Sequence, residues 1–76
     1  MRVRKLPTLP WQLSGREWQV MMLWIEFGRL KAVARELDIS YKTVESHVYN
    51  ARKKIKPTGT NVQALLEFDR AMRRTE

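Results

Sequence analysis

Side chains that form hydrogen bonds or carry positive charge are concentrated in one short segment, residues 39 to 56 (ISYKTVESHVYNARKKIK). After Ser40, the apolar residues Val44, Val48 and Ile55 recur at helical spacing, so we predict a helix over about residues 41–55 that Ser40 caps. The side chains that then point outward are Glu45, Ser46, Tyr49 and Asn50. A carboxylate, a hydroxyl, a phenol and an amide on one face suit recognition by hydrogen bonding.

This segment also carries most of the excess positive charge. Its cations are Lys42, Arg52, Lys53, Lys54 and Lys56, and its one acid is Glu45. Five cations minus one acid leave +4, out of a formal net charge of +7 for the chain. Such an excess attracts polyanions, either nucleic acid or an anionic membrane surface. The first backbone amides of the helix, at residues 41 to 43, can also meet a phosphate at the positive end of the helix dipole.

A helix with such a face fits the major groove of duplex DNA. Glu45 can accept a hydrogen bond from a cytosine amino group and Asn50 can pair with an adenine edge. Ser46 allows close approach, and Tyr49 can touch a thymine methyl group or a phosphate. We predict base contacts by these four residues. We predict phosphate contacts by Lys42, Thr43, Arg52, Lys53 and Lys56.

Each of these residues also has an ordinary structural interpretation. Glu45 can pair with a lysine one turn away, and Tyr49 can be a half-buried packing residue. The basic residues near the helix end can simply complement the helix dipole. The functional interpretation depends on all of them acting together on one face.

Composition argues against catalysis and against metal binding. The chain has 76 residues, no cysteine and a single histidine, His47, so we predict no catalytic residue, no metal site and no cofactor. His47 follows Val44 by three residues and is predicted to be structural, with its ring bonded to a backbone group or a phosphate. The longest apolar run, residues 20 to 25, is too short for a membrane span, and no signal peptide is recognisable. We therefore expect a soluble, cytoplasmic protein.

The remaining elements are predicted from caps and breakers. Residues 1–12 contain two prolines and three cations, so we predict a basic extended arm, which is either a solubilising tail or lies along DNA. Residues 13–76 form the predicted domain. Ser14 and Glu17 form a capping box and Gly28 ends that helix; Thr60 and Gln63 form a second capping box for the last helix. Helices over residues 30–37 and 41–55 complete an all-α, four-helix prediction.

The first predicted helix is apolar on more than one side. A core-facing stripe consists of Leu13, Val20, Met21, Trp24 and Phe27. A second apolar line consists of Trp18, Met22 and Ile25. Either the last helix or the segment around Trp11 covers this second line, or it is a docking patch for another chain.

The two middle helices have the sequence form of a helix-turn-helix. Leu30, Val33, Ala34 and Leu37 recur at helical spacing in the first of them. Ala34 is small enough to let two crossing helices approach closely. Asp38 stands where the chain reverses, and aspartate is one of the few residues other than glycine that tolerate a left-handed conformation.

These motifs together resemble the LuxR/FixJ-type DNA-binding domain of bacterial transcriptional regulators. The matching stretches are LSGRE at 13 to 17, VARELDIS at 33 to 40 and KTVESHVYNARKKI at 42 to 55. The resemblance implies a four-helix domain whose third helix enters the major groove and whose fourth helix forms a homodimer. The dimer residues that it implies are Val62, Leu65, Leu66 and Asp69. The sequence departs from the family pattern at Gly28, at Asp38 and at the acidic Glu45.

Two alternatives remain from the sequence. Residues 42–55 are also similar to region four of bacterial sigma factors and to small phage activators, which touch RNA polymerase at promoters. The capped final helix favours the LuxR type. Alternatively, the chain is a protein-interaction module that captures and silences another regulator. We predict a sequence-specific DNA-binding transcriptional regulator.

Overall fold

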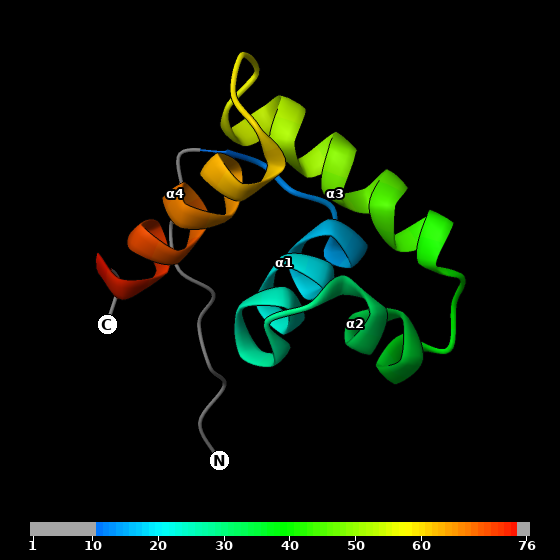
Figure 1. The fold of residues 1–76 in the computed structure, drawn as a ribbon. Coiled ribbons are helices and arrows are strands. Elements are labelled where there is room, and N and C mark those ends of the chain that lie inside the picture. Colours follow the sequence, from blue (N-terminus) through cyan, green and yellow to red (C-terminus); the bar gives the residue numbers. More distant parts are fainter. Residues whose placement is uncertain (1–10, 75–76) are drawn as a thin grey trace.

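Four helices and no strand make up the part of the chain that the computed structural model describes, residues 11–74. They are α1 (Gly15–Phe27), α2 (Leu30–Leu37), α3 (Tyr41–Ile55) and α4 (Asn61–Arg74). The all-α prediction is confirmed. Figure 1 shows α1 between α2 and α4, with α3 running across the top of the molecule. Of the predicted arm, only Trp11 and Gln12 belong to the described residues, so the prediction for residues 1–10 lies outside them.

Local hydrogen bonds set the helix starts that the sequence predicts. The Ser14 hydroxyl accepts from the Glu17 amide at 3.1 Å, and the Glu17 carboxylate accepts from the Ser14 amide at 3.0 Å. At the start of α4, the Thr60 hydroxyl accepts from the Gln63 amide, and the Gln63 side-chain oxygen accepts from the Thr60 amide. Both predicted capping boxes are present.

The helix ends also follow the sequence. Gly28 ends α1 with a φ of 81°, in the left-handed region that glycine adopts without strain. Asp38 ends α2 with a φ of 56°, as predicted. The Ile39 amide then donates to the Ala34 carbonyl at 3.1 Å. This turn reverses the chain in three residues and sets the direction in which α3 leaves α2.

Two core clusters hold α3 along its length. The first joins α1, α2 and α3 and contains Val20, Val33, Ala34, Val44 and Val48. The second joins α1, α3 and α4 and contains Met21, Ala51, Ile55, Ala64 and Phe68. The first half of α3 therefore packs against α2 and its second half against α4, while α1 supports both. Because both halves are buried against other helices, the exposed face of α3 has a fixed orientation.

The predicted apolar stripe of α1 is correct except at its end. Val20 and Met21 are fully buried, and Leu13 and Trp24 pack against the clusters. Phe27 is 38% exposed, so its placement in the core was wrong. It lies in the last turn of α1, beyond the packed residues, and lines a shallow surface hollow beside α2.

The buried face of α4 is formed by residues that the sequence interpretation did not single out. Phe68 and Ala64 are fully buried, whereas Val62 and Leu66 are exposed. The sequence interpretation omitted Phe68 from the core. A helix with apolar residues on two sides does not by itself indicate which side meets the core, because periodicity gives angles within the helix and not the position of its neighbours.

Candidate nucleic-acid interface

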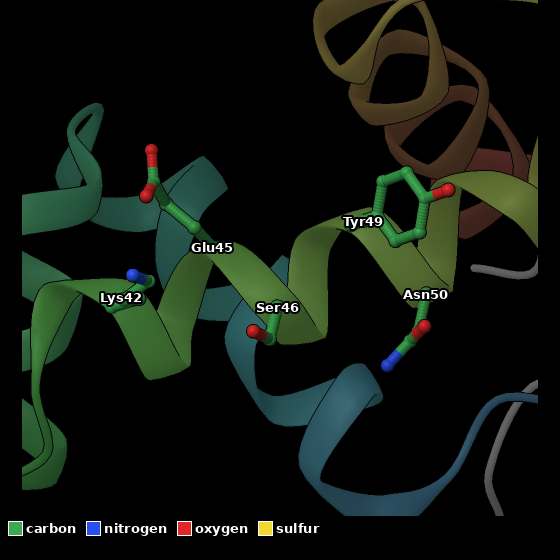
Figure 2. A pocket seen from close by; sticks show the side chains of 5 residues that line it. All are labelled: Lys42, Glu45, Ser46, Tyr49 and Asn50. Carbon is green, nitrogen blue, oxygen red and sulfur yellow. The ribbon is translucent and has the colours of Figure 1, made fainter.

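The four residues predicted to contact bases lie together on the exposed side of α3. Glu45, Ser46, Tyr49 and Asn50 are all exposed, and with Lys42 they line a shallow hollow of about 280 Å³. Figure 2 shows Glu45 and Tyr49 on one side of the helix axis and Ser46 and Asn50 on the other. The outward direction of these side chains agrees with the spacing in the sequence; their contacts with bases stay a prediction.

The start of α3 is capped more tightly than we expected. The Ser40 hydroxyl accepts from the Thr43 amide at 3.0 Å and lies 2.8 Å from the Thr43 hydroxyl. The Thr43 amide is therefore engaged within the helix, and the expectation that it is free for a phosphate was wrong. The exposed side chains of Tyr41 and Lys42 stand at the same end of the helix.

Two cations flank the Tyr49 ring near the other end of this face. The Arg52 guanidinium carbon lies 5.2 Å from the ring centroid and the Lys53 ammonium nitrogen lies 5.3 Å from it. Such cation–π contacts orient the aromatic ring and hold both cations beside it. Tyr49 is 50% exposed and its ring contacts both cations, so the base-contact and the packing interpretations both stay open.

Arg52 has a structural role that the sequence interpretation missed: it binds the loop that follows α3. Its Nη1 donates to the carbonyl oxygens of Pro57 at 3.0 Å and Gly59 at 3.1 Å. These bonds tie the end of α3 to the loop that leads into α4. No feature of the sequence indicates which side chain donates to these loop carbonyls. The phosphate contact predicted for Arg52 stays a prediction, but one donor of this side chain is already used.

Lys54 forms an ion pair with a buried acid, although its own side chain is 43% exposed. Its ammonium nitrogen lies 2.7 Å from the Glu17 carboxylate, which is buried. The pair joins the first turn of α1 to the last turn of α3. Lys53 remains exposed and Lys56 is half-buried. Of the predicted phosphate contacts, Lys42 and Lys53 are the lysines whose side chains lie most openly on the surface of α3.

The pKa of the Glu17 carboxyl is lowered from its ordinary value of 4.5. Burial alone raises this pKa. The hydrogen bond from Lys54, the hydrogen bond from the Ser14 amide and the positive charge of Lys54 outweigh burial, because all three favour the ionised form. Glu17 is therefore held as a carboxylate that serves both a helix cap and an interhelical ion pair.

Replacing Glu17 with glutamine should test this pair. Glu17→Gln keeps an oxygen for the Ser14 amide but removes the charge opposite Lys54, so we expect the free energy of unfolding at neutral pH to fall by about 1–2 kcal/mol. The folded-state pKa is depressed, so the stabilisation is present above the unfolded-state value of 4.5 and is lost as pH falls through the lower folded-state value. Urea denaturation of both chains from neutral to acidic pH measures this difference.

The difference between the two chains should shrink on acidification. Glu26→Gln, which alters an exposed acid on the same helix, is the matched control and should show no such effect. A loss of stability in Glu17→Gln that stays constant with pH would show that the charge of Glu17 is not what stabilises the contact.

The residues proposed for dimerisation have different surroundings. On α4, Val62 is 57% and Leu66 is 58% exposed. Leu65 is half-buried against the second core cluster, and Asp69 accepts a hydrogen bond from Arg73 Nε at 3.2 Å. Val62 and Leu66 thus present aliphatic surface to solvent on the outer side of α4.

The second apolar line of α1 is covered in one part and open in another. Trp18 meets the Phe68 ring edge-on at a centroid distance of 5.4 Å, and Trp11 stacks on the same ring at 6.3 Å. Met22 and Ile25 remain 37% and 36% exposed. The last helix therefore covers Trp18, and the possible partner patch is reduced to Met22 and Ile25.

Other kinds of site find little support within residues 11–74. No group of three or more metal-ligating side chains is present there. His47 is half-buried. Among these residues, no helix combines the length and the hydrophobicity that crossing a bilayer requires.

Comparison with known proteins gives one match. A family model described as bacterial regulatory proteins, luxR family, matches residues 11–66. The match begins at Trp11, covers α1, α2 and α3, and ends within α4 at Leu66. No curated protein and no solved structure matches the chain.

Proposed function

Since the chain belongs to the luxR family of bacterial regulatory proteins, it is a DNA-binding helix-turn-helix transcriptional regulator, and we propose that it recognises specific sequences by placing α3 in the major groove. Helix-turn-helix domains of this family are DNA-binding regulators and not enzymes. The observation that carries the proposal is the exposed face of α3, where five side chains line one hollow.

The polar side chains of this face are the proposed base contacts. Glu45 and Tyr49 lie on one side of the α3 axis and Ser46 and Asn50 on the other, so the two pairs of side chains reach different parts of the groove (Figure 2). Glu45 accepts from a cytosine amino group, and Asn50 pairs with an adenine edge. Ser46 is short enough to let the helix approach, and the ordered ring of Tyr49 meets a thymine methyl group or a phosphate.

The cations at both ends of the face are the proposed phosphate contacts. Lys42 and the hydroxyl of Thr43 serve the start of α3, and Lys53 and Lys56 serve its end. These contacts fix the register of the helix without reading the sequence. Arg52 is the weakest candidate, because it already donates to the loop carbonyls of Pro57 and Gly59.

We further propose a homodimer through α4. Val62 and Leu66 are large aliphatic side chains, one helical turn apart, that are more than half exposed. Aliphatic groups paired in this way gain free energy when a second copy removes them from water. A two-fold dimer presents two copies of α3 to half-sites that are related by the same symmetry.

Selection of bound sequences from a random DNA pool tests the proposal most directly. We expect a preferred sequence with two-fold symmetry, because each copy of α3 reads one half-site. Titration of the recovered duplex against a scrambled duplex then gives the specificity ratio at a stated salt concentration. Recovery of random sequences, with equal affinity for both duplexes, would refute sequence-specific recognition.

Replacing Lys53 with alanine should weaken binding to every sequence. Loss of one phosphate contact should lower the slope of log affinity against log salt by about 1. Sequence preference should not change, because a phosphate carries no base identity and Arg52 still contacts the Tyr49 ring when Lys53 is removed. The measurement is fluorescence anisotropy with the recovered and the scrambled duplex over a range of salt concentrations.

Arg70→Ala is the matched control for Lys53→Ala. It removes the same charge from an exposed position on α4, outside the face of α3. The salt slope of this variant should stay close to that of the unchanged chain, because charges beyond about 10 Å are screened at 0.1 M salt. Equal changes in both variants would mean that overall charge, and not a contact by Lys53, determines the slope.

A further inference from the structure

A groove between α1 and α4 remains open beside the proposed dimer face. Met22 and Ile25 of α1 and Asp69, Met72 and Arg73 of α4 line it, with a volume of about 330 Å³. We call it the α1–α4 groove. Met22 and Ile25 are about one-third exposed, so the groove presents apolar surface to solvent at a place where two helices meet.

The groove shares residues with the exposed side of α4. Residues 62, 66, 69 and 73 are spaced by four, three and four, so Val62, Leu66, Asp69 and Arg73 form one line along the helix, the outer stripe. Its first two residues are aliphatic and its last two belong to the groove. The aliphatic end and the groove are therefore two ends of one surface.

We propose that the α1–α4 groove receives Val62 from the α4 helix of a second copy of this chain. The proposal deepens the proposed homodimer and rests on it. In a two-fold interface, contact of Val62 with the groove of the other copy requires the reciprocal contact as well. The two α4 helices then run antiparallel, with Leu66 near the symmetry axis and both grooves filled.

The outer stripe alone is too small for a stable dimer interface, which favours an interface that includes the groove. Protein interfaces of ordinary stability bury roughly 800 Å² on each partner and involve about 20–30 residues a side. The outer stripe offers four residues. Addition of Met22, Ile25 and Met72 extends the contact onto α1 and adds apolar surface on both sides of the central Leu66.

Charge also favours the antiparallel arrangement. Arg73 of the outer stripe lies near the end of α4, so parallel pairing would bring the Arg73 side chains of both copies together. Antiparallel pairing separates them. Asp69 pairs with Arg73 within each copy at 3.2 Å, but this contact is exposed on the Arg73 side and offsets only part of the repulsion.

Disulfide trapping tests the predicted contact, because the chain contains no cysteine and each introduced thiol is unique. Ile25→Cys and Val62→Cys place single thiols in the groove and on the outer stripe, at exposed positions where folding should be preserved. The two variants are mixed, one of them with a larger tag, and oxidised mildly in full-length form. We expect the mixed disulfide to exceed either homodimer about tenfold, because a disulfide needs Cα atoms within about 7 Å.

Lys31→Cys provides the control thiol. Lys31 is exposed on α2, which does not contact α4 within the described residues, so its mixture with Val62→Cys should give no mixed disulfide above background. Sedimentation equilibrium adds a second measurement. Ile25→Lys should raise the dimer dissociation constant about tenfold, whereas Gln19→Lys, which adds the same charge to α1 outside the groove, should not.

The outcomes separate this proposal from the DNA-binding proposal. Predominant Val62 homodimers would mean parallel pairing or a crossing point at Val62, and would overturn the groove contact while leaving a dimer. A chain that binds its selected DNA but forms no disulfide in any mixture would also overturn it. In both cases DNA recognition by α3 would stand. Conversely, a mixed disulfide in a chain that shows no sequence preference would support the groove contact and refute the proposed recognition.

Discussion

Replacing Phe68 with alanine should reduce the free energy of unfolding by about 3–5 kcal/mol, which is the usual cost of removing a buried phenylalanine ring. Phe68 is fully buried in the second core cluster, and its ring meets both Trp11 and Trp18. A domain of 76 residues has a stability of about 4–11 kcal/mol in total. The variant should therefore be partly or wholly unfolded at room temperature, as circular dichroism and urea denaturation can measure.

Leu66→Ala is the matched control for this effect. Leu66 lies half a turn before Phe68 on α4 but is more than half exposed, so its replacement should change stability by no more than about 0.5 kcal/mol in the monomer. Phe68→Leu should fall between the two, because it keeps an apolar side chain in the cavity. Equal losses in Phe68→Ala and Leu66→Ala would contradict the packing of α4 described above.

Replacing Glu45 with alanine should lower the sequence preference of the protein and raise its affinity for non-specific DNA. If Glu45 accepts from a cytosine amino group, its loss should cost about 1–3 kcal/mol of discrimination at one base pair of each half-site. That corresponds to about a 5- to 150-fold loss of preference at this position. Affinity for scrambled DNA should rise, because an acid that repels phosphates has been removed from a basic face.

Competition binding with duplexes that vary at single positions measures both effects. Glu26→Ala is the matched control, because it removes an exposed acid from α1 and leaves the face of α3 intact. This variant should keep the base preference of the unchanged chain. A Glu45→Ala variant that retains full preference at every position would exclude Glu45 as a base contact, even if its overall affinity had changed.

The helix boundaries follow from sequence because short-range interactions determine them. Ser14, Ser40 and Thr60 each cap a helix through the amide three residues ahead, and Gly28 and Asp38 end helices by adopting positive φ angles. The exposed direction of Glu45, Ser46, Tyr49 and Asn50 also follows from sequence. Once Val44 and Val48 are assigned to the core, helical geometry fixes the angle of every other side chain on α3.

Only the tertiary structure decided which basic residues of α3 already have a partner within the protein that competes with a phosphate. Glu17 and Lys54 are 37 positions apart, and their ion pair offsets the charge of one lysine in the basic cluster of α3. Arg52 is committed to carbonyls of the following loop. The sequence shows that these side chains are charged and how they are spaced, but their partners depend on the packing of α1 and of the loop against α3.

The faces of α1 and α4 were likewise settled by packing. Both helices have apolar residues on more than one side, and sequence periodicity ranks these sides only by hydrophobicity. The structure buries Phe68 and leaves Val62 and Leu66 exposed, and it covers Trp18 but not Ile25. The physical reason is that helix caps and turns act over a few residues of one chain segment, whereas burial depends on which surfaces of separate helices fit together in three dimensions.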